Sequence, residues 1–226
     1  MRIALFSDVH ANLPAFEAFL ANLDQQKVDA VYCLGDLIGY HIWPNEVINE
    51  VRRRGIAMLA GNHDLKVKGY AYELISDDNR AYLNTLPAHV RLEYQLNSDH
   101  LNIVLAHGSP RSINEYVIED LDEDYVLGMM EEANADILCV GHSHIPYHRV
   151  LGGKQVINTG SVGKPKDSNP DGCYVILTLG EKSVVTEPGS VGIEIVRFPY
   201  DVERAARAIE DSPLPNELAE QLRKAF

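Results

Sequence analysis

The side chains best suited to chemistry occur in five short polar clusters, each directly after an apolar run. The clusters are Asp8-Val9-His10, Gly35-Asp36, Gly61-Asn62-His63-Asp64, His107-Gly108 and Gly141-His142-Ser143-His144. Aspartate, asparagine and histidine offer oxygen and nitrogen atoms that bind metal ions or transfer protons. The clusters would form one reactive site if the fold brought them together.

Seven of these side chains form a candidate set of metal ligands: two carboxylates, one amide and four imidazoles, with no thiolate. They are Asp8, His10, Asp36, Asn62, His107, His142 and His144. Mixed oxygen and nitrogen ligands suit manganese, iron, zinc or cobalt. Because seven ligands exceed the needs of one tetrahedral zinc, we expect two cations that share one carboxylate. Paired cations about 3.5–4 Å apart activate water and stabilise charge on a transferring phosphoryl group.

Each of these residues alone has a more ordinary interpretation. An aspartate after a strand is usually a turn or helix-cap residue, and a single histidine is more often structural or exposed. The ordinary interpretation is kept for the four histidines outside the clusters, His41, His89, His100 and His148. The joint pattern is different, because five of the nine histidines fall in the clusters. This concentration favours a shared site over coincidence.

The apolar runs before the clusters predict five strands of a sheet covered on both faces. They span residues 2–7, 30–35, 56–61, 101–106 and 136–141. Helix-like segments lie between them, at residues 14–26, 44–54, 70–86 and 121–133. Because sites in α/β sheets form at the carboxyl ends of strands, the clusters are expected to meet in one crevice. Four glycines allow close backbone approach there: Gly35, Gly61, Gly108 and Gly141.

The pattern changes after residue 150. Residues 155–158, 173–179 and 192–198 read as strands joined by short turns, which predicts antiparallel pairing. Residues 202–226 are predicted to be helical, with a break at 212–215. This amphipathic tail is expected to cover a sheet, and a dimer surface is the alternative. A single domain over residues 1–226 is the simplest organisation.

Composition and charge narrow the setting. The chain has 226 residues, 46% of them hydrophobic and 23% charged, which is typical of a globular protein. Cys33, Cys139 and Cys173 lie in apolar runs without a CxxC pair, which indicates buried thiols in a reducing compartment. The apolar runs are too short for a signal peptide or a membrane span, so we expect a cytoplasmic protein without a membrane partner. The net charge of -13 argues against stable nucleic-acid binding.

The five clusters together resemble the signature of the calcineurin-like metallophosphoesterase superfamily. That signature reads D-x-H, G-D, G-N-H-[DE], H and G-H-x-H, and every part is present here, in order, between residues 8 and 144. The resemblance implies an α/β fold, a four-layer α/β/β/α sandwich with two facing mixed β-sheets flanked by helices. It also implies an enzyme that hydrolyses phosphate ester bonds with two divalent metal ions, manganese being favoured.

The resemblance assigns roles to individual residues. Asp8, His10 and His144 would hold the first metal. Asn62, His107 and His142 would hold the second, and Asp36 would bridge both. His63 would be catalytic without binding metal, by protonating the leaving alkoxide or stabilising the transition state. Asp64 would orient His63, with a helix N-cap as the equally weighted alternative.

A closer resemblance is to a small bacterial and archaeal branch of phosphodiesterases and diadenosine-polyphosphatase-related proteins. It rests on Gly39-Tyr40, on Pro44-Asn45-Glu46-Val47-Ile48 and on Asn158-Thr159-Gly160-Ser161-Val162-Gly163. The run His41-Ile42-Trp43 departs from that branch, and its large aromatic ring either lines a substrate pocket or packs. Lys164 and Lys166 are candidates for contact with a substrate phosphate, although a solvated loop is the favoured interpretation.

The expected reaction is hydrolysis of a small-molecule phosphate ester, preferably a phosphodiester, by a metal-bound hydroxide. No Ser or Cys nucleophile is needed, and the sequence contains no nucleophile elbow, P-loop or dinucleotide fingerprint. The alternatives are a phosphomonoesterase, a phosphoprotein phosphatase, a dinucleoside polyphosphate hydrolase, or a non-catalytic interaction scaffold on the same fold. The intact ligand set argues against the scaffold. A homo-oligomer stays open.

Overall fold

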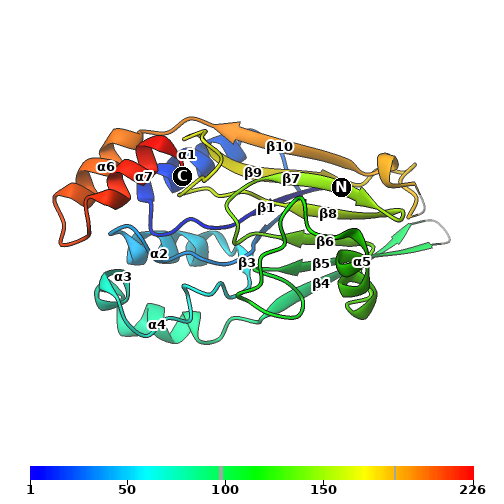
Figure 1. Cartoon of the computed structure of the whole chain (residues 1–226), viewed down its shortest axis with the longest axis horizontal. Helices are drawn as coiled ribbons and strands as arrows, with labels where there is room; N and C mark the ends of the chain where they lie inside the picture. Colours follow the sequence, from blue (N-terminus) through cyan, green and yellow to red (C-terminus); the bar gives the residue numbers. More distant parts are fainter. Residues whose placement is uncertain (97–98, 186) are drawn as a thin grey trace.

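Two five-stranded sheets form the centre of the molecule (Figure 1). The computed structural model describes residues 1–96, 99–185 and 187–226. The strand order of the first sheet is β10 (Gly192–Phe198), β9 (Gly172–Thr178), β1 (Arg2–Phe6), β2 (Ala30–Cys33) and β3 (Ala57–Met58). The order of the second is β4 (His89–Leu96), β5 (Asp99–Ala106), β6 (Ile137–Val140), β8 (Lys154–Asn158) and β7 (Tyr147–Leu151). Both sheets are mixed, since β1 and β2 pair in parallel but β1 and β9 antiparallel, and β5 and β6 pair in parallel but β4 and β5 antiparallel.

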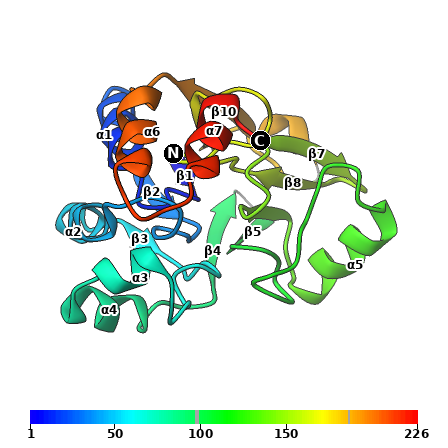
Figure 2. The same ribbon diagram turned by 60° about the vertical axis from the view of Figure 1, so that its left-hand side comes forward.

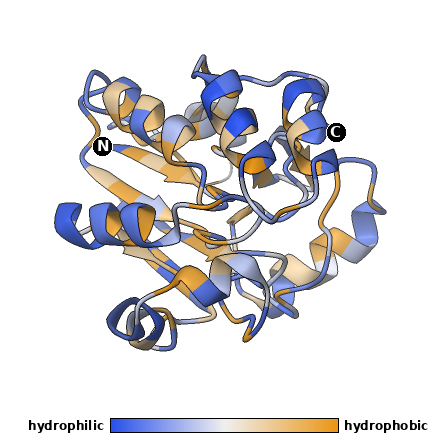
Figure 3. Ribbon diagram, turned by 90° about the vertical axis from the view of Figure 1, so that its left-hand side faces the viewer, coloured by the Kyte–Doolittle hydropathy of each residue, from blue (hydrophilic) through white to orange (hydrophobic). Residues whose placement is uncertain are grey.

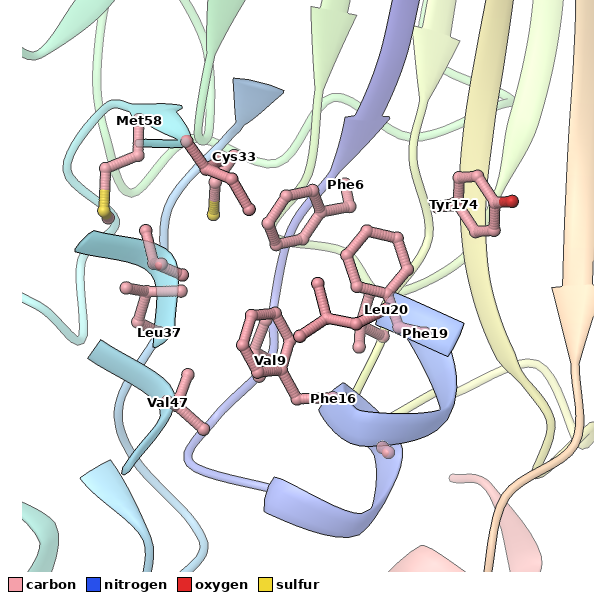
Figure 4. Packing of buried hydrophobic residues seen from close by; sticks show 14 of the residues in the cluster. Phe6, Val9, Phe16, Phe19, Leu20, Cys33, Leu37, Val47, Met58 and Tyr174 are labelled. Carbon is pink, nitrogen blue, oxygen red and sulfur yellow. The ribbon is translucent and has the colours of Figure 1, made fainter. Parts of the chain in front are cut away.

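The side chains of β1 point alternately to the two faces of its sheet, which shows how the layers are held together. Ile3 and Leu5 belong to the core between the two sheets, whereas Ala4 and Phe6 face the helices. On that helical side, Phe6 packs against Phe16 and Phe19 of α1 (Leu13–Leu23), as Figure 4 shows. Helix α2 (Pro44–Arg54) joins the same core. On the far side, α5 (Glu123–Glu132) covers the second sheet.

The layers therefore run helix, sheet, sheet, helix, and the predicted fold class is confirmed. Figure 3 shows the hydrophobic residues concentrated on the strands and on the helix faces turned toward them. The three cysteines are buried and free, as expected. No helix within the described ranges combines the length and apolar character needed to cross a bilayer.

Four further helices complete the described structure: α3 (Tyr70–Leu74), α4 (Asp77–Leu83), α6 (Val202–Glu210) and α7 (Glu217–Lys224), with a short 3₁₀ helix at Pro188–Ser190. The single helix predicted over residues 70–86 is wrong. Ile75 is extended, and the Ser76 side chain accepts the N–H of Asn79, so the chain ends one helix and caps a second.

Two other expectations need correction, and two strands were missed. Strands β4 and β7 were not predicted, because β4 is half exposed along its whole length and lacks a continuous apolar run. Strand β8 pairs in parallel with β6 as well as antiparallel with β7. The C-terminal helices do not lie on a sheet. Helix α6 packs mainly on α7, through Ala205, Ile209 and Leu222, and also contacts α1.

Candidate metal centre

The structure brings six of the seven predicted ligands into two compact groups. One contains Asp8, His10 and His144, and the other contains Asp36, His107 and His142. Within each group the candidate ligand atoms all lie within 4.8 Å of one another. The seventh, Asn62, joins the second group, because its amide oxygen lies 3.1 Å from Nε2 of His107. The groups come from the ends of β1, β2, β3, β5 and β6, so the expected convergence of strand ends is present.

Three imidazoles are fixed in the same way. Nδ1 of His10 lies 2.9 Å from the carbonyl oxygen of Ile38, and Nδ1 of His107 lies 2.8 Å from that of Leu34. His144 makes the equivalent bond to the carbonyl of Lys164. A carbonyl can only accept, so Nδ1 of each ring carries the proton. In the neutral form of each ring, Nε2 is thereby left as the lone-pair donor, directed toward the cluster, which is the arrangement of a metal-ligating histidine.

The separations between ligand atoms suit shared coordination. Nε2 of His144 lies 3.2 Å from Oδ1 of Asp8, and Nε2 of His107 lies 3.3 Å from Oδ2 of Asp36. Nε2 of His10 lies 3.5 Å from Asp8 and 3.7 Å from Asp36. Ligands bound about 2.0–2.2 Å from one ion stand roughly 3 Å apart. His10 and Asp36 thus connect the two groups.

The two carboxylates each keep one oxygen for the cluster. Oδ2 of Asp8 accepts hydrogen bonds from the Ser7 hydroxyl and the His142 N–H. Its other oxygen, Oδ1, is buried and has no hydrogen-bond partner among the described residues, and the same holds for Nε2 of His142. Orphaned buried polar atoms are costly. Two of them at candidate ligand positions fit a bound cation.

Five of the predicted ligands have an unusual backbone. Their φ angles are positive, in the left-handed region: Asp8 (56°), His10 (53°), Asp36 (59°), His142 (65°) and His144 (63°). For residues other than glycine this conformation costs of order 1–3 kcal/mol each and clusters at functional sites. Close approach is also built in, because a Cβ at Gly61 would lie 2.1 Å from Oδ1 of Asp36, and one at Gly141 would lie 2.8 Å from Oδ2 of Asp8.

The electrostatics couple the carboxylates to the imidazoles. Burial acts to raise the pKa of Asp8 and Asp36, but the neighbouring histidines outweigh it and hold both below the usual range. Burial acts against protonation of His107, yet Asp36 raises its pKa to about 9. Cations bound here would take over this pairing and release protons from the histidines.

His63 and Asp64 are placed differently from each other. The ring of His63 stands 4.9 Å from the ring of His10, and burial lowers its pKa to about 3. The expectation that Asp64 orients His63 is wrong. Both Asp64 oxygens accept backbone N–H groups instead, from Gly61 at 2.9 Å and from Asp36 at 2.7 Å, and also from Leu37 and Ile38. The helix-cap alternative is also wrong, since Asp64 binds two loops together.

The basic loop is partly buried. Only 3% of Lys164 is exposed, and its ammonium lies 5.0 Å from the centre of the Tyr40 ring. The interpretation of a solvated loop is therefore wrong for Lys164. Burial lowers its pKa to about 8. Burial also lowers the pKa of Lys166, which is within electrostatic reach of Asp8 and Asp36.

The run His41-Ile42-Trp43 packs against the backbone of the loop that carries His10. His41 is buried, and its Nδ1 lies 2.9 Å from the carbonyl oxygen of His10. The N–H of Trp43 donates to the carbonyl of Ala11 at 3.2 Å. These contacts hold the first ligand loop, and the structural interpretation of His41 is confirmed.

Sequence reasoning missed three neighbours of the cluster. The Ser7 hydroxyl bonds Asp8, the Lys66 ammonium lies 2.9 Å from Nε2 of His63, and Tyr116 stacks on His142 at 4.1 Å. Ser7 and Lys66 stand beside the clusters in sequence, but nothing in their spacing distinguishes them. Tyr116 follows the fourth cluster by several residues and gives no local signal.

Comparison with known proteins agrees with this geometry. The family model of the calcineurin-like phosphoesterase superfamily domain matches residues 1–182. An uncharacterized protein of Methanocaldococcus jannaschii is 30% identical, over 97% of this chain and 96% of its own. A probable metallophosphoesterase of Bacillus subtilis is 36% identical over 53% of this chain and 59% of its own.

A solved structure extends the likeness to the whole chain. The crystal structure of a metallophosphoesterase from Sphaerobacter thermophilus superimposes with a TM-score of 0.79, at 26% identity, over 100% of both chains. Family match, fold and the buried aspartate–histidine cluster agree with one another. The chain belongs to the calcineurin-like phosphoesterase superfamily, whose members use divalent metals, and it is a phosphate ester hydrolase.

Proposed function

We propose that this chain, acting as one domain over residues 1–226, hydrolyses a phosphodiester with the help of two divalent cations. The observation that carries the proposal is the set of three imidazoles, His10, His107 and His144, whose Nδ1 atoms are tied to backbone carbonyls while their Nε2 atoms converge on Asp8 and Asp36. The choice of a diester follows the resemblance to the phosphodiesterase branch.

The proposed ligand assignment follows the two groups. Asp8, His10 and His144 hold one cation, and Asn62, His107 and His142 hold the other. Asp36 lies between them, with Oδ2 facing both His10 and His107. Bound cations of this kind acidify water and offset the negative charge of a phosphoryl group. Manganese suits the mixed oxygen and nitrogen ligands.

The chain's own residues complete the proposed chemistry. His63 lies beside both His10 and Asp36, so its ring would stand next to a phosphoryl group that bound at the cluster. A bound ester anion would counter the burial that lowers the pKa of His63, so the ring is suited to give a proton or a hydrogen bond to the departing oxygen. Lys164 and Lys166 add positive charge on the opposite loop.

The test is hydrolysis of bis-p-nitrophenyl phosphate by the purified protein, with and without manganese. We expect manganese to stimulate turnover and exhaustive chelation to abolish it. Asp36→Asn and His107→Ala should each abolish turnover, because each removes a ligand from the cluster. His148→Ala is the matched control, since His148 bonds Gln155 on β7 and β8, away from the cluster.

Elemental analysis of the same preparations gives a second readout. The wild type should carry up to two metal equivalents, and both ligand variants should carry fewer. Turnover that survives chelation would rule out the proposed chemistry. A phosphomonoester, a phosphopeptide and a dinucleoside polyphosphate should be assayed in parallel. Faster hydrolysis of one of them would make its class, and not the diester, the proposed substrate.

A further inference from the structure

A cavity of about 260 Å³ opens beside the candidate metal centre. It shares two residues with the site, because Tyr40 and His63 line it. The Tyr40 ring lies 4.7 Å from the ring of His10 and 4.8 Å from that of His63, so it stands where the cavity adjoins the cluster. Ligand pockets commonly measure about 300–1,000 Å³. This cavity is therefore sized for one part of a ligand.

The walls of the cavity are mainly apolar and aromatic. Three tyrosines line it, Tyr40, Tyr70 and Tyr72, together with several aliphatic residues: Ile38, Ala71, Leu214 and Leu218. Aromatic side chains bind flat rings by stacking and by edge contacts, and stacking on a nucleobase is worth about 1–3 kcal/mol. The lining thus suits a planar ring better than a sugar or a peptide.

Positive charge lies at the same place. Lys66 and Lys68 line the cavity and are exposed, and neither forms an ion pair with another described residue. Lys164 and Lys166 lie closer to the metal cluster, so four of the chain's eight lysines lie at the cluster or at the adjoining cavity, in a protein whose net charge is -13. Such a local reversal of charge draws an anionic ester toward the centre.

Part of the cavity wall comes from α7 and the segment before it. Leu214 precedes α7 and Leu218 lies within it, beyond residue 182 where the family match ends. Helix α7 is anchored by Leu222 against α6, and the carbonyl of Ala225 accepts the N–H of Ser168. Figures 1 and 2 show α7 and α3 at the same end of the molecule.

We propose that this cavity binds the alcohol portion of the substrate ester and that this portion is a flat aromatic ring, as in an aryl or nucleobase-bearing ester. The inference rests on the proposed function, which puts the phosphoryl group at the metal cluster. His63 then stands between phosphorus and the ring, on the side of the departing oxygen. Leu214 and Leu218 complete the pocket and give this chain its preference.

Two pairs of probes test the inference by isothermal titration calorimetry on the manganese-loaded protein. Phenylphosphonate and methylphosphonate share the phosphonate and differ in the ring. Adenosine 5′-monophosphate and ribose 5-phosphate differ in the base. We expect the ring-bearing member of at least one pair to bind about tenfold tighter. The pair with the larger gain tells an aryl pocket from a nucleobase pocket.

Point variants show which residues produce the gain in affinity that comes from the ring. Tyr72→Ala and Leu218→Ala both change the lining of the cavity, and each should cut the gain below about threefold, with little effect on methylphosphonate. Tyr82→Ala is the matched control. Tyr82 is also half-buried against the same core and has Arg52 over its ring as Tyr72 has Arg80, but it does not line the cavity.

The outcomes separate this inference from the proposed function. If methylphosphonate binds and bis-p-nitrophenyl phosphate is hydrolysed, but neither ring improves binding, the pocket assignment is wrong and the enzyme assignment stands. A ring gain that persists in both Tyr72→Ala and Leu218→Ala also overturns the pocket assignment. If neither phosphonate binds and manganese-dependent hydrolysis is absent, the proposed function fails and takes this inference with it.

Discussion

At the scale of single residues, the cluster is pre-organised by bonds that point away from it. His10, His107 and His144 each use Nδ1 for a hydrogen bond to a backbone carbonyl. Oδ2 of Asp8 accepts hydrogen bonds from Ser7 and His142. The remaining ligand atoms, Nε2 of the three histidines and Oδ1 of Asp8, face the cluster. Outer partners of this kind set the tautomer and orientation of a ligand, so their loss typically weakens metal affinity about 10–100-fold.

His63 is the residue whose role most needs a test, because its ring nitrogen also lies within 4.8 Å of ligand atoms of His10 and Asp36. If it assists the departing oxygen, His63→Ala should lower kcat by about 10²–10⁴-fold and leave the metal content near that of the wild type. Steady-state kinetics and elemental analysis on the same sample check both halves of this prediction.

The exposed residue His89, at the start of β4, supplies the control variant His89→Ala. It should match the wild type in turnover and in metal content. Loss of about one metal equivalent in His63→Ala alone would make His63 a ligand and leave the departing oxygen without its proposed partner.

At the scale of elements, five strand ends deliver the ligands, and the loops after them turn sharply. The left-handed backbone at five ligand positions shows that these turns are strained. Contacts between loops stabilise the strained backbone, such as the hydrogen bonds that Asp64 accepts from four backbone N–H groups. The loop after β3 is thereby locked to the loop after β2.

Gly61 is the position where these two loops touch most closely. In Gly61→Ala the added Cβ would lie 2.1 Å from Oδ1 and 2.2 Å from the backbone nitrogen of Asp36. The Asp36 carboxylate must shift, and we expect manganese affinity to fall by about 10–100-fold, with loss of turnover. Calorimetric titration with manganese measures the first effect.

Gly180→Ala is the control, because a Cβ at Gly180 meets nothing within 4 Å. Its manganese affinity should be unchanged. Equal affinities in Gly61→Ala and the wild type would show that the loops yield without moving Asp36, and that the close approach has no bearing on the cluster.

Sequence reasoning located the strands that carry ligands because each is a continuous apolar run that ends in a polar cluster. It also placed α2, whose bounds of Pro44 and Arg54 match the prediction, because Pro44 opens the helix and Gly55 ends it in a left-handed cap. It missed β4 because an edge strand exposed on one face lacks such a run.

The error over Asp64 has a different cause. Its position beside His63 in sequence suggested contact, but whether a carboxylate faces a ring or a neighbouring loop depends on tertiary packing. The cavity could not be predicted for the same reason, since Tyr72 and Leu218 both line it although they are far apart in the chain.

At the scale of the whole molecule, the cluster joins the two sheets. Asp8, His10, Asp36 and Asn62 follow strands of the first sheet, whereas His107, His142 and His144 follow strands of the second. Each proposed cation would therefore be held by residues from both sheets. Below the cluster the sheets are bound by the apolar core that Leu5 and Leu105 share.

This arrangement predicts that metal stabilises the fold as well as the site. A ligand that binds only the folded state at 100 times its dissociation constant adds about 2.7 kcal/mol. For a domain of this size each kcal/mol raises Tm by about 2–4 °C, so saturating manganese should raise Tm by roughly 5–10 °C over the chelated protein. Differential scanning calorimetry with and without manganese measures this rise in Tm.

Asp36→Asn should show little of the rise in Tm, because the substitution weakens the residue that connects the two groups of ligands. Potassium at equal ionic strength should produce no rise. An unchanged Tm in wild type that carries metal by elemental analysis would mean that the cations bind the unfolded chain as tightly as the folded one, which would contradict a site that exists only when ligands from both sheets are brought together.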